Sequence, residues 1–203
     1  MFETKKPGLH FIRCLTGTCA LFAVYASLHY LPLAQTVSLT FASPIFSTIL
    51  SIIILHEVVR MRRWLAIILG FIGVCVLVNP FSTDFTVYMF LPLTFCFFFA
   101  MVSISIRKLS ETEPTYLVAL YFTIFGIIAS LVTMPLFGAW KIPVSMSDLL
   151  ILTCVGVSGG IGNLALTAAF KNAEVSIVTP LKYLSLIYAI IFGSVSYTHL
   201  RAH

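Results

Sequence analysis

A lysine within an apolar run has the most specific chemistry in this sequence. Lys182 lies close to Pro180 in the run 175–195, where an ionisable side chain is costly unless it faces protein or a water-filled cavity. In a cavity, Lys182 would neutralise a carboxylate or another anionic group of a bound solute. Alternatively, its long side chain reaches the nearby membrane surface, and the residues do not decide between the two. Tyr183 points to another side of the helix, where tyrosine more often packs than binds a ligand.

Two pairs of polar residues also lie within apolar runs, each pair spaced four residues apart. Tyr25 and His29 form one pair, and Asn163 and Thr167 form the other. This spacing places both members on one helix face, so Tyr25, His29 and Asn163 are candidates to hydrogen-bond a solute. Polar groups in membrane helices also bond to neighbouring helices and so hold the bundle together, which is favoured for Thr167 and Ser43. His29 lies near the end of its run, which favours a satisfied helix-end histidine.

A charged segment after the run 36–55 is a candidate gate. Glu57 is followed by Arg60 and Arg63, and an ion pair between the carboxylate and one of these arginines could break when a cavity opens to that side. The alternative, which is favoured, is that the arginines fix the orientation of the chain in a membrane and Glu57 only balances their charge.

Residues 156–160 match the GxSxG pattern of a serine nucleophile, with Ser158 as the serine. Such a serine needs a general base beside it, and the histidines that follow, His199 and His203, lie in an atypical C-terminal stretch. The two outer glycines instead fit the small-xxx-small spacing with which membrane helices approach closely. We therefore predict no catalytic residue and no enzyme.

Metal and nucleotide sites have no support in the sequence. The histidines at positions 10, 29 and 56 lack the spacing of metal ligands, and the five cysteines include no CxxC pair. No Gly-Lys-Ser/Thr motif follows the glycines, so a phosphate-binding loop is not expected. We predict no metal and no cofactor.

The elements that carry these residues are apolar runs of membrane-spanning length. Hydrophobic residues make up 60% of the 203 residues and charged residues 9%, against about 45–50% and about 25% in soluble proteins. A run of about 20 apolar residues crosses the hydrocarbon core as a helix, so an all-α integral membrane protein is predicted. Seven spans are expected, at residues 11–31, 36–55, 64–79, 86–106, 115–137, 149–170 and 175–195.

The net charge of +5 does not indicate a nucleic-acid partner, because the basic residues are sorted between the loops. The loops alternate between basic and nearly neutral, as the positive-inside rule requires. With a cytoplasmic N-terminus, only Lys141 falls in an outside loop, and Arg13 anchors the first span at the cytoplasmic surface. The basic residues expected inside are Lys5, Lys6, Arg13, Arg60, Arg62, Arg63, Arg107, Lys108 and Lys171.

An internal repeat relates two of these regions. The stretch from Ala26, ASLHYLPLAQTVSLTFASPIF, is similar to the stretch from Ala165, ALTAAFKNAEVSIVTPLKYL, with Gln35 matching Glu174 and a proline interrupting each following span. The two copies are expected to enter the membrane from opposite sides. That arrangement is typical of inverted-repeat transporters, whose solute sites lie near the midplane where broken helices meet. Membrane composition alone could also produce such a match.

Two stretches resemble EamA-type transporters of the drug/metabolite transporter superfamily. That family's helical hairpin and following helix are similar to YLPLAQTVSLTFASPIFSTILSIIILHEVVRMRRWLAIILGFIGVCVLVNP, and its second repeat is similar to GNLALTAAFKNAEVSIVTPLKYLSLIYAIIFG. His56 stands where the family has the glycine of a Leu-Gly-Glu motif. The run TPLKYLSLIYAIIFG is similar to the branch that carries S-adenosylmethionine and amino-acid derivatives.

The resemblance implies ten helices in two five-helix repeats with both termini cytoplasmic, so seven spans suggest a truncated chain. Residues 1–80 would hold the C-terminal part of the first repeat, which is the third to fifth helices of the family. Residues 81–195 would be an incomplete second repeat, and residues 196–203 a non-native tail.

The sequence thus predicts a secondary transporter that moves a small organic metabolite or drug-like solute across a bacterial inner membrane by alternating access. Its predicted partners are the solute and the lipid bilayer, with a homodimer allowed. An intramembrane hydrolase that uses Ser158 and a structural membrane protein without transport are the alternatives. The expected solute-binding residues are Lys182, Tyr183, Tyr25, His29 and Asn163, and the expected gating residues are Glu57 and Arg60.

Overall fold

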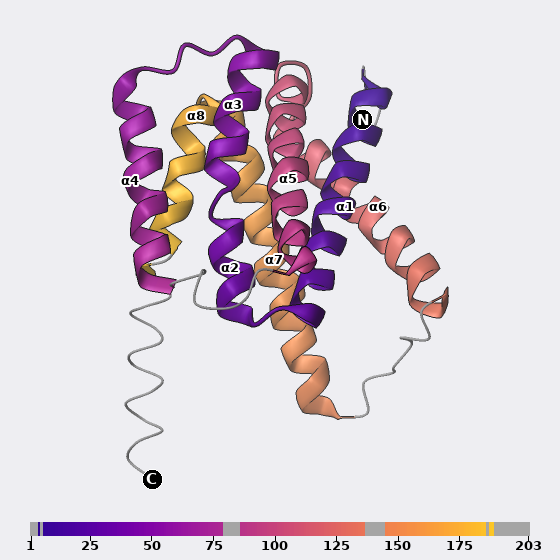
Figure 1. The fold of residues 1–203 in the computed structure, drawn as a ribbon. Helices are drawn as coiled ribbons and strands as arrows, with labels where there is room; N and C mark the ends of the chain where they lie inside the picture. Colours follow the sequence, from indigo (N-terminus) through magenta and orange to yellow (C-terminus); the bar gives the residue numbers. More distant parts are fainter. Residues whose placement is uncertain (1–3, 5, 79–85, 137–144, 186, 189–203) are drawn as a thin grey trace.

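The computed structural model describes residues 4, 6–78, 86–136, 145–185 and 187–188, and every regular element in these ranges is helical (Figure 1). The expected tail at 196–203 lies outside the described residues. The elements are α1 (Pro7–Tyr30), α2 (Leu33–Thr40), α3 (Ser43–Leu55), α4 (Met61–Val78), η1 (Val87–Met89), α5 (Phe90–Leu109), α6 (Thr115–Leu136), α7 (Met146–Asn172), α8 (Val175–Val178) and η2 (Thr179–Tyr183).

Five helical segments are long and apolar enough to span a membrane, which confirms the predicted all-α membrane fold. α4 corresponds to the expected span 64–79 but is not among the five. Its 18 residues give a length of only about 27 Å at a rise of about 1.5 Å per residue. Of the expected span 175–195, the described residues extend to 188. The five segments are Pro7–Tyr30, Gln35–Leu55, Val87–Leu109, Thr115–Pro135 and Met146–Asn172.

A proline separates α2 from α3. Pro44 has no N–H, so it cannot donate to the carbonyl of Thr40 one turn earlier. Between the two helices the chain makes two tight turns, in which the N–H groups of Phe41 and Ala42 each donate to a carbonyl three residues earlier at 3.1 Å. The Thr40 carbonyl therefore needs a donor from another part of the chain.

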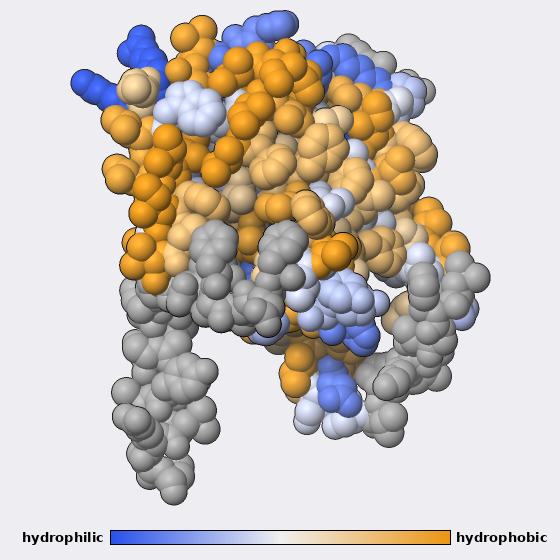
Figure 2. Space-filling model, in the orientation of Figure 1, coloured by the Kyte–Doolittle hydropathy of each residue, from blue (hydrophilic) through white to orange (hydrophobic). Residues whose placement is uncertain are grey.

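α5 is the central helix of the bundle, and its contacts with α1 and α3 are the most extensive (Figure 1). A buried apolar cluster joins it to α6, α7 and α8. Figure 2 shows hydrophobic residues over much of the face in view. α6 and α7 expose many aliphatic side chains, as expected of helices that face lipid. The cluster consists of Val102, Ile104, Ile106, Leu109, Val118, Phe170 and Val175.

One end of the bundle, at the top of Figure 1, carries most of the described positive charge, and we call it the basic end. α3 and α5 end there, and α4 and α6 begin there. The turn after α3 is made by His56, whose φ of 54° and ψ of 32° are left-handed. Glycine adopts this conformation without steric cost, whereas another residue costs about 1–3 kcal/mol. The basic end comprises Lys6, Arg60, Arg62, Arg63, Arg107, Lys108 and Lys171.

A close contact between a glycine and an aromatic ring sets the distance between α4 and η2. The ring of Tyr183 lies against Gly70, where an added Cβ would be 2.5 Å from the ring carbon Cδ2. An added Cβ on Gly73, almost one turn further along α4, would meet nothing within 4 Å. Only a glycine at position 70 therefore allows the observed packing of this ring.

We expect Gly70→Ala to lower the stability of the protein. Overpacking costs about 1–3 kcal/mol, which is partly offset by up to about 1 kcal/mol from the helix propensity of alanine. Gly73→Ala is the matched control, because it gains the same propensity without the clash. The apparent melting temperature in detergent should fall for Gly70→Ala and stay level or rise for Gly73→Ala. Equal melting temperatures for the two variants would contradict this contact.

Candidate functional site

Lys182 occupies the gap that Pro44 leaves between α2 and α3. Its Nζ donates to the Thr40 carbonyl at 3.0 Å and to Ser43 Oγ at 2.8 Å. Because Pro44 has no N–H, the Thr40 carbonyl has no donor within its own helix. The ammonium group takes the place of the missing N–H. The side chain of Lys182 is thus directed into the bundle and not toward a membrane surface.

Three aromatic rings surround the ammonium group. The Nζ of Lys182 lies 5.7 Å from the ring centroid of Phe41, 5.1 Å from that of Phe95 and 5.3 Å from that of Phe99. Aromatic faces attract a cation by about 0.5–2 kcal/mol, so these rings partly replace water around the charge. Among the described residues, no Asp or Glu forms an ion pair with Lys182. The arrangement can therefore attract an anionic or electron-rich group.

Tyr183, from the same turn, makes the contacts of a packing residue. Its hydroxyl donates to the carbonyl of Ile67 in α4 at 3.3 Å. Its ring also stacks on Phe41 with 6.0 Å between the centroids. Tyr183 thus reaches the Lys182 site through Phe41 and ties that site to α4.

The contact between Ser43 and Lys182 joins equivalent positions of the internal repeat. These two residues are 139 positions apart, the same separation as between Gln35 and Glu174, which the repeat aligns. α2 and α3 run toward the basic end, whereas α8 starts at that end and η2 leads away from it (Figure 1). Equivalent residues of two inverted copies can touch only near the axis that relates the copies. With the stretches from Ala26 and Ala165 taken as inverted copies, Lys182 would lie at their centre.

At the basic end, Glu57 bonds to the start of α8. Its two carboxylate oxygens accept from the N–H groups of Val175 at 2.8 Å and Ser176 at 3.0 Å. Arg63 forms an ion pair with Glu174 and donates to Ser176 Oγ at 2.8 Å. The carboxylate and the arginine are thus engaged with residues at the start of α8 and not with each other.

Arg60, the other expected gating residue, is exposed beside this cluster. No contact of its side chain occurs in the described part of the chain that would link it to Glu57. We call the set Glu57, Arg63, Glu174 and Ser176 the basic-end cluster.

A cavity of about 660 Å³ lies between α1, α6 and α7. Tyr25 and Asn163, both expected to bind a solute, line it, whereas Lys182 and Tyr183 belong to the site at the α2–α3 break. His29 lies elsewhere, with its exposed ring set edge-on against Tyr30 at 4.9 Å. The expected solute-binding residues therefore fall into two groups with one outlier.

Among the described residues, the hydroxyl of Thr167 bonds within its own helix and not to a neighbouring helix, which was the role favoured for it from the sequence. Thr167 is fully buried, and its hydroxyl donates to the carbonyl of Asn163 in its own helix at 2.8 Å. The side-chain amide of Asn163 is left to face α1.

Arg13 is the functional candidate that the sequence did not reveal. It was expected at the membrane surface, but only 2% of its area is exposed. Its guanidinium carbon lies 4.1 Å from the ring centroid of Phe122, and its Nη2 donates to Asn163 Oδ1 at 3.3 Å. Gly17 makes room for both side chains, since an added Cβ there would lie 2.6 Å from each. The sequence feature that could have indicated this burial is the glycine four positions after the arginine, because it leaves space on the same helix face.

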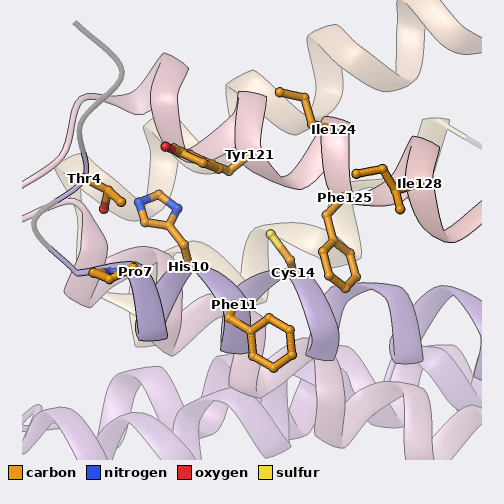
Figure 3. A pocket seen from close by; sticks show the side chains of 9 residues that line it. All are labelled: Thr4, Pro7, His10, Phe11, Cys14, Tyr121, Ile124, Phe125 and Ile128. Atoms are coloured by element: carbon orange, nitrogen blue, oxygen red, sulfur yellow. The ribbon is translucent and has the colours of Figure 1, made fainter.

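A smaller cavity, of about 300 Å³, lies between α1 and α6 (Figure 3). His10 points toward Tyr121 across it, with 4.7 Å between ring centroids. Apolar side chains, among them Phe11, Phe125 and Ile128, make up most of its wall. The smaller cavity is therefore an apolar space with one histidine at its margin.

Ser158 has the surroundings of an ordinary helical serine. It is exposed on α7, and its hydroxyl donates to the carbonyl of Val155 in the same helix at 3.1 Å. The neighbouring glycines do not make the expected close helix contact in the described structure, because an added Cβ at Gly156 or Gly160 would meet nothing within 4 Å. They line the larger cavity instead. In the described ranges, no group of three or more His, Cys, Asp or Glu residues could hold a metal ion.

The sequence model of the EamA-like transporter family matches residues 2–79 and 86–199. The chain is 29% identical to a riboflavin transporter of Vibrio cholerae, over 94% of this chain and 64% of that protein. It is 28% identical to an S-adenosylmethionine uptake transporter of Rickettsia prowazekii, over 93% and 63%. It is also 29% identical to a pseudopaline exporter of Pseudomonas aeruginosa, over 87% and 62%. The family and these relatives are transporters and not enzymes, as predicted.

A solved crystal structure has a similar fold, with a TM-score of 0.77 and 19% identity over 95% of this chain and 69% of that chain. At this identity the similarity shows the fold alone. The chain spans less than two thirds of the length of the three curated relatives.

We expect Glu57→Ala to loosen the start of α8, because two backbone N–H groups lose their acceptor. Loss of such a cap costs about 1–2 kcal/mol, which corresponds to about five- to thirtyfold faster local opening. Hydrogen–deuterium exchange of the Val175 and Ser176 amides should accelerate accordingly. Arg60→Ala is the matched control from the same loop and should leave the exchange unchanged. Equal exchange in both variants would show that Glu57 does not hold the two repeats together.

Proposed function

Because the chain belongs to the EamA-like transporter family, we propose that the protein moves a small organic solute across a bacterial inner membrane by alternating access. The two inverted repeats would rock around a fixed centre, as in other transporters built from inverted repeats. The integral membrane setting agrees with the five apolar spans.

The observation that carries this proposal is the contact of Lys182, in η2, with the break between α2 and α3. Broken helices in a membrane persist where the freed backbone groups find partners or line a cavity. Here the freed Thr40 carbonyl and the Ser43 hydroxyl both accept from Lys182. An ammonium group has three donors, so a solute with an acceptor could bind to this lysine or compete for it. The solute would then couple directly to the geometry of the break between α2 and α3.

The basic-end cluster fits the role of a closure on one side. Glu57, in the loop after α3, and Arg63, in the first turn of α4, bond to the start of α8. An opening between the repeats at this end must break those bonds, so we assign the gate to Glu57 and Arg63, with Arg60 outside it. The positive charge of this end supports its placement on the cytoplasmic side, together with the N-terminus.

The solute is proposed to be an organic metabolite. The relatives are named for riboflavin, S-adenosylmethionine and pseudopaline, which share heteroatom-rich polar groups on a carbon framework. The 660 Å³ cavity falls within the range of about 300–1,000 Å³ that is typical of small-molecule sites.

We expect proteoliposomes that contain the protein to release specific solutes from a loaded bacterial metabolite extract, as detected by mass spectrometry. Lys182→Met should reduce this release at least about tenfold, since a buried charge-assisted contact contributes about 1.5–3 kcal/mol. Ser158→Ala is the control and should release the same solutes at the same rate. Melting temperatures recorded in parallel separate a lost function from a lost fold. Unchanged release by a well-folded Lys182→Met variant would refute the proposed centre.

A further inference from the structure

Arg13 is a buried cation with unused hydrogen-bond donors. Its Nη2 donates to Asn163, but its Nε and Nη1 have no hydrogen-bond partner among the described residues. No Asp or Glu in the described ranges forms an ion pair with it. A guanidinium group has five N–H donors in a planar fork that matches carboxylate and phosphate oxygens. Of these five N–H groups, the three on Nε and Nη1 are buried and unpaired among the described residues.

The same face of α1 carries a second buried group that lacks a hydrogen-bond partner among the described residues. His10 lies three residues before Arg13, so the two share a helix face. His10 is 4% exposed, and neither ring nitrogen has a hydrogen-bond partner in the described structure. Glu113 acts electrostatically on His10, and its carboxylate accepts from Thr4 at 2.8 Å. This face of α1 thus offers more donors than its protein surroundings satisfy.

Burial without compensation makes Arg13 unsuitable as a purely structural residue. Removal of a charge from water costs several kcal/mol unless acceptors replace the water. One amide oxygen at 3.3 Å and one aromatic face at 4.1 Å supply only part of that replacement. An anion bound at the unpaired edge of the guanidinium group would supply the rest.

Asn163 connects this arginine to the larger cavity. It bonds to Arg13 and is also part of the cavity wall. From there the cavity extends along α1 past Thr18 and Phe22 to Tyr25. Its walls are mainly apolar and aromatic, and the glycine face of α7 gives it width. The cavity thus has a polar end, at Asn163, and apolar walls along the rest of its length. This combination suits an amphipathic ligand.

We propose that the cavity between α1, α6 and α7 binds an anionic group, a carboxylate or a phosphate, that is carried on an apolar body. Arg13 is the anion-binding residue, and Asn163 positions it. An organic anion from solution and the headgroup of an anionic lipid share this chemistry. If the ligand comes from solution, organic anions are the transported class, a step that rests on the proposed transport function.

Calorimetric titration of the protein in phosphatidylcholine nanodiscs tests the site with two probes of the same shape. Phenylacetate carries the anionic group, and phenylacetamide is its neutral isostere. Phenylacetate should bind at least about tenfold more tightly, since charge-assisted hydrogen bonds to arginine are about twice as strong as neutral ones. Equal affinities for the two probes would overturn the proposal.

Asn163→Asp is the decisive variant, because it should keep the fold while it fills the site. The new carboxylate would lie where an oxygen is already 3.3 Å from Arg13 Nη2, and it would form an internal ion pair with that arginine. Phenylacetate affinity should then fall at least about tenfold, and the melting temperature should not fall. Arg13→Gln should give the same loss of affinity, whereas Ser158→Ala, on an exposed part of α7, should retain wild-type affinity.

A second titration, in nanodiscs that contain an anionic lipid, identifies the source of the anion. Addition of phosphatidylglycerol to the nanodiscs should weaken phenylacetate binding in the wild type if the headgroup occupies Arg13, and should have no effect if the ligand is a soluble anion. Either result supports the site.

Wild-type affinity for phenylacetate in Asn163→Asp, or no response of the wild type to either anion, overturns it. Solute release without anion binding refutes this site alone, whereas anion binding without solute release refutes only the transport proposal.

Discussion

The structure depends on one constraint, which is that a backbone carbonyl freed within an apolar bundle must find a donor. Pro44 withdraws the N–H that would bond to Thr40, and a bilayer has no water to replace it. Lys182 supplies the donor at 3.0 Å and is fixed in turn by Ser43 at 2.8 Å. The break between α2 and α3 is therefore stabilised by a residue from the other half of the chain. A lysine can reside at this depth because its positive charge lies against a carbonyl oxygen and three aromatic rings.

A reciprocal arrangement is present at the basic end. There the first repeat supplies the partner, since Glu57 accepts from the two N–H groups that open α8. Each repeat thus satisfies backbone groups of the other, by a cation at the central break and by a carboxylate at the end of the bundle. Relative movement of the repeats must exchange these bonds for others, which limits the structure to a few discrete arrangements. This is the physical basis on which we assign the centre to Lys182 and the gate to Glu57 and Arg63.

The sequence predicted the parts of the structure that follow from local composition. Apolar run length predicted the spans, and Pro44 predicted the interruption between α2 and α3. The energetic cost of a charge in an apolar run indicated that Lys182 has a special role. Its partners, however, lie 139 and 142 residues away in the sequence, so no local pattern could identify them. Arg13 was misjudged because an arginine near the start of a span is usually a surface anchor. Its burial depends on Gly17, Phe122 and Asn163, three residues from three helices whose packing is a tertiary property. Glu57 was paired with the nearest arginines for the same reason, whereas the folded chain brings α8 closer.

The central claim is that Lys182 stands in for the N–H that Pro44 lacks, and a double-mutant cycle tests it most directly. Pro44→Ala restores a donor for the Thr40 carbonyl, so Lys182→Met should cost less in that background than in the wild type. We predict a coupling of at least about 1 kcal/mol in the apparent free energy of unfolding in mixed micelles, within the range of about 0.5–3 kcal/mol found for residues in one hydrogen-bond network. Additivity of the two substitutions to within about 0.5 kcal/mol, as for independent sites, would contradict the claim.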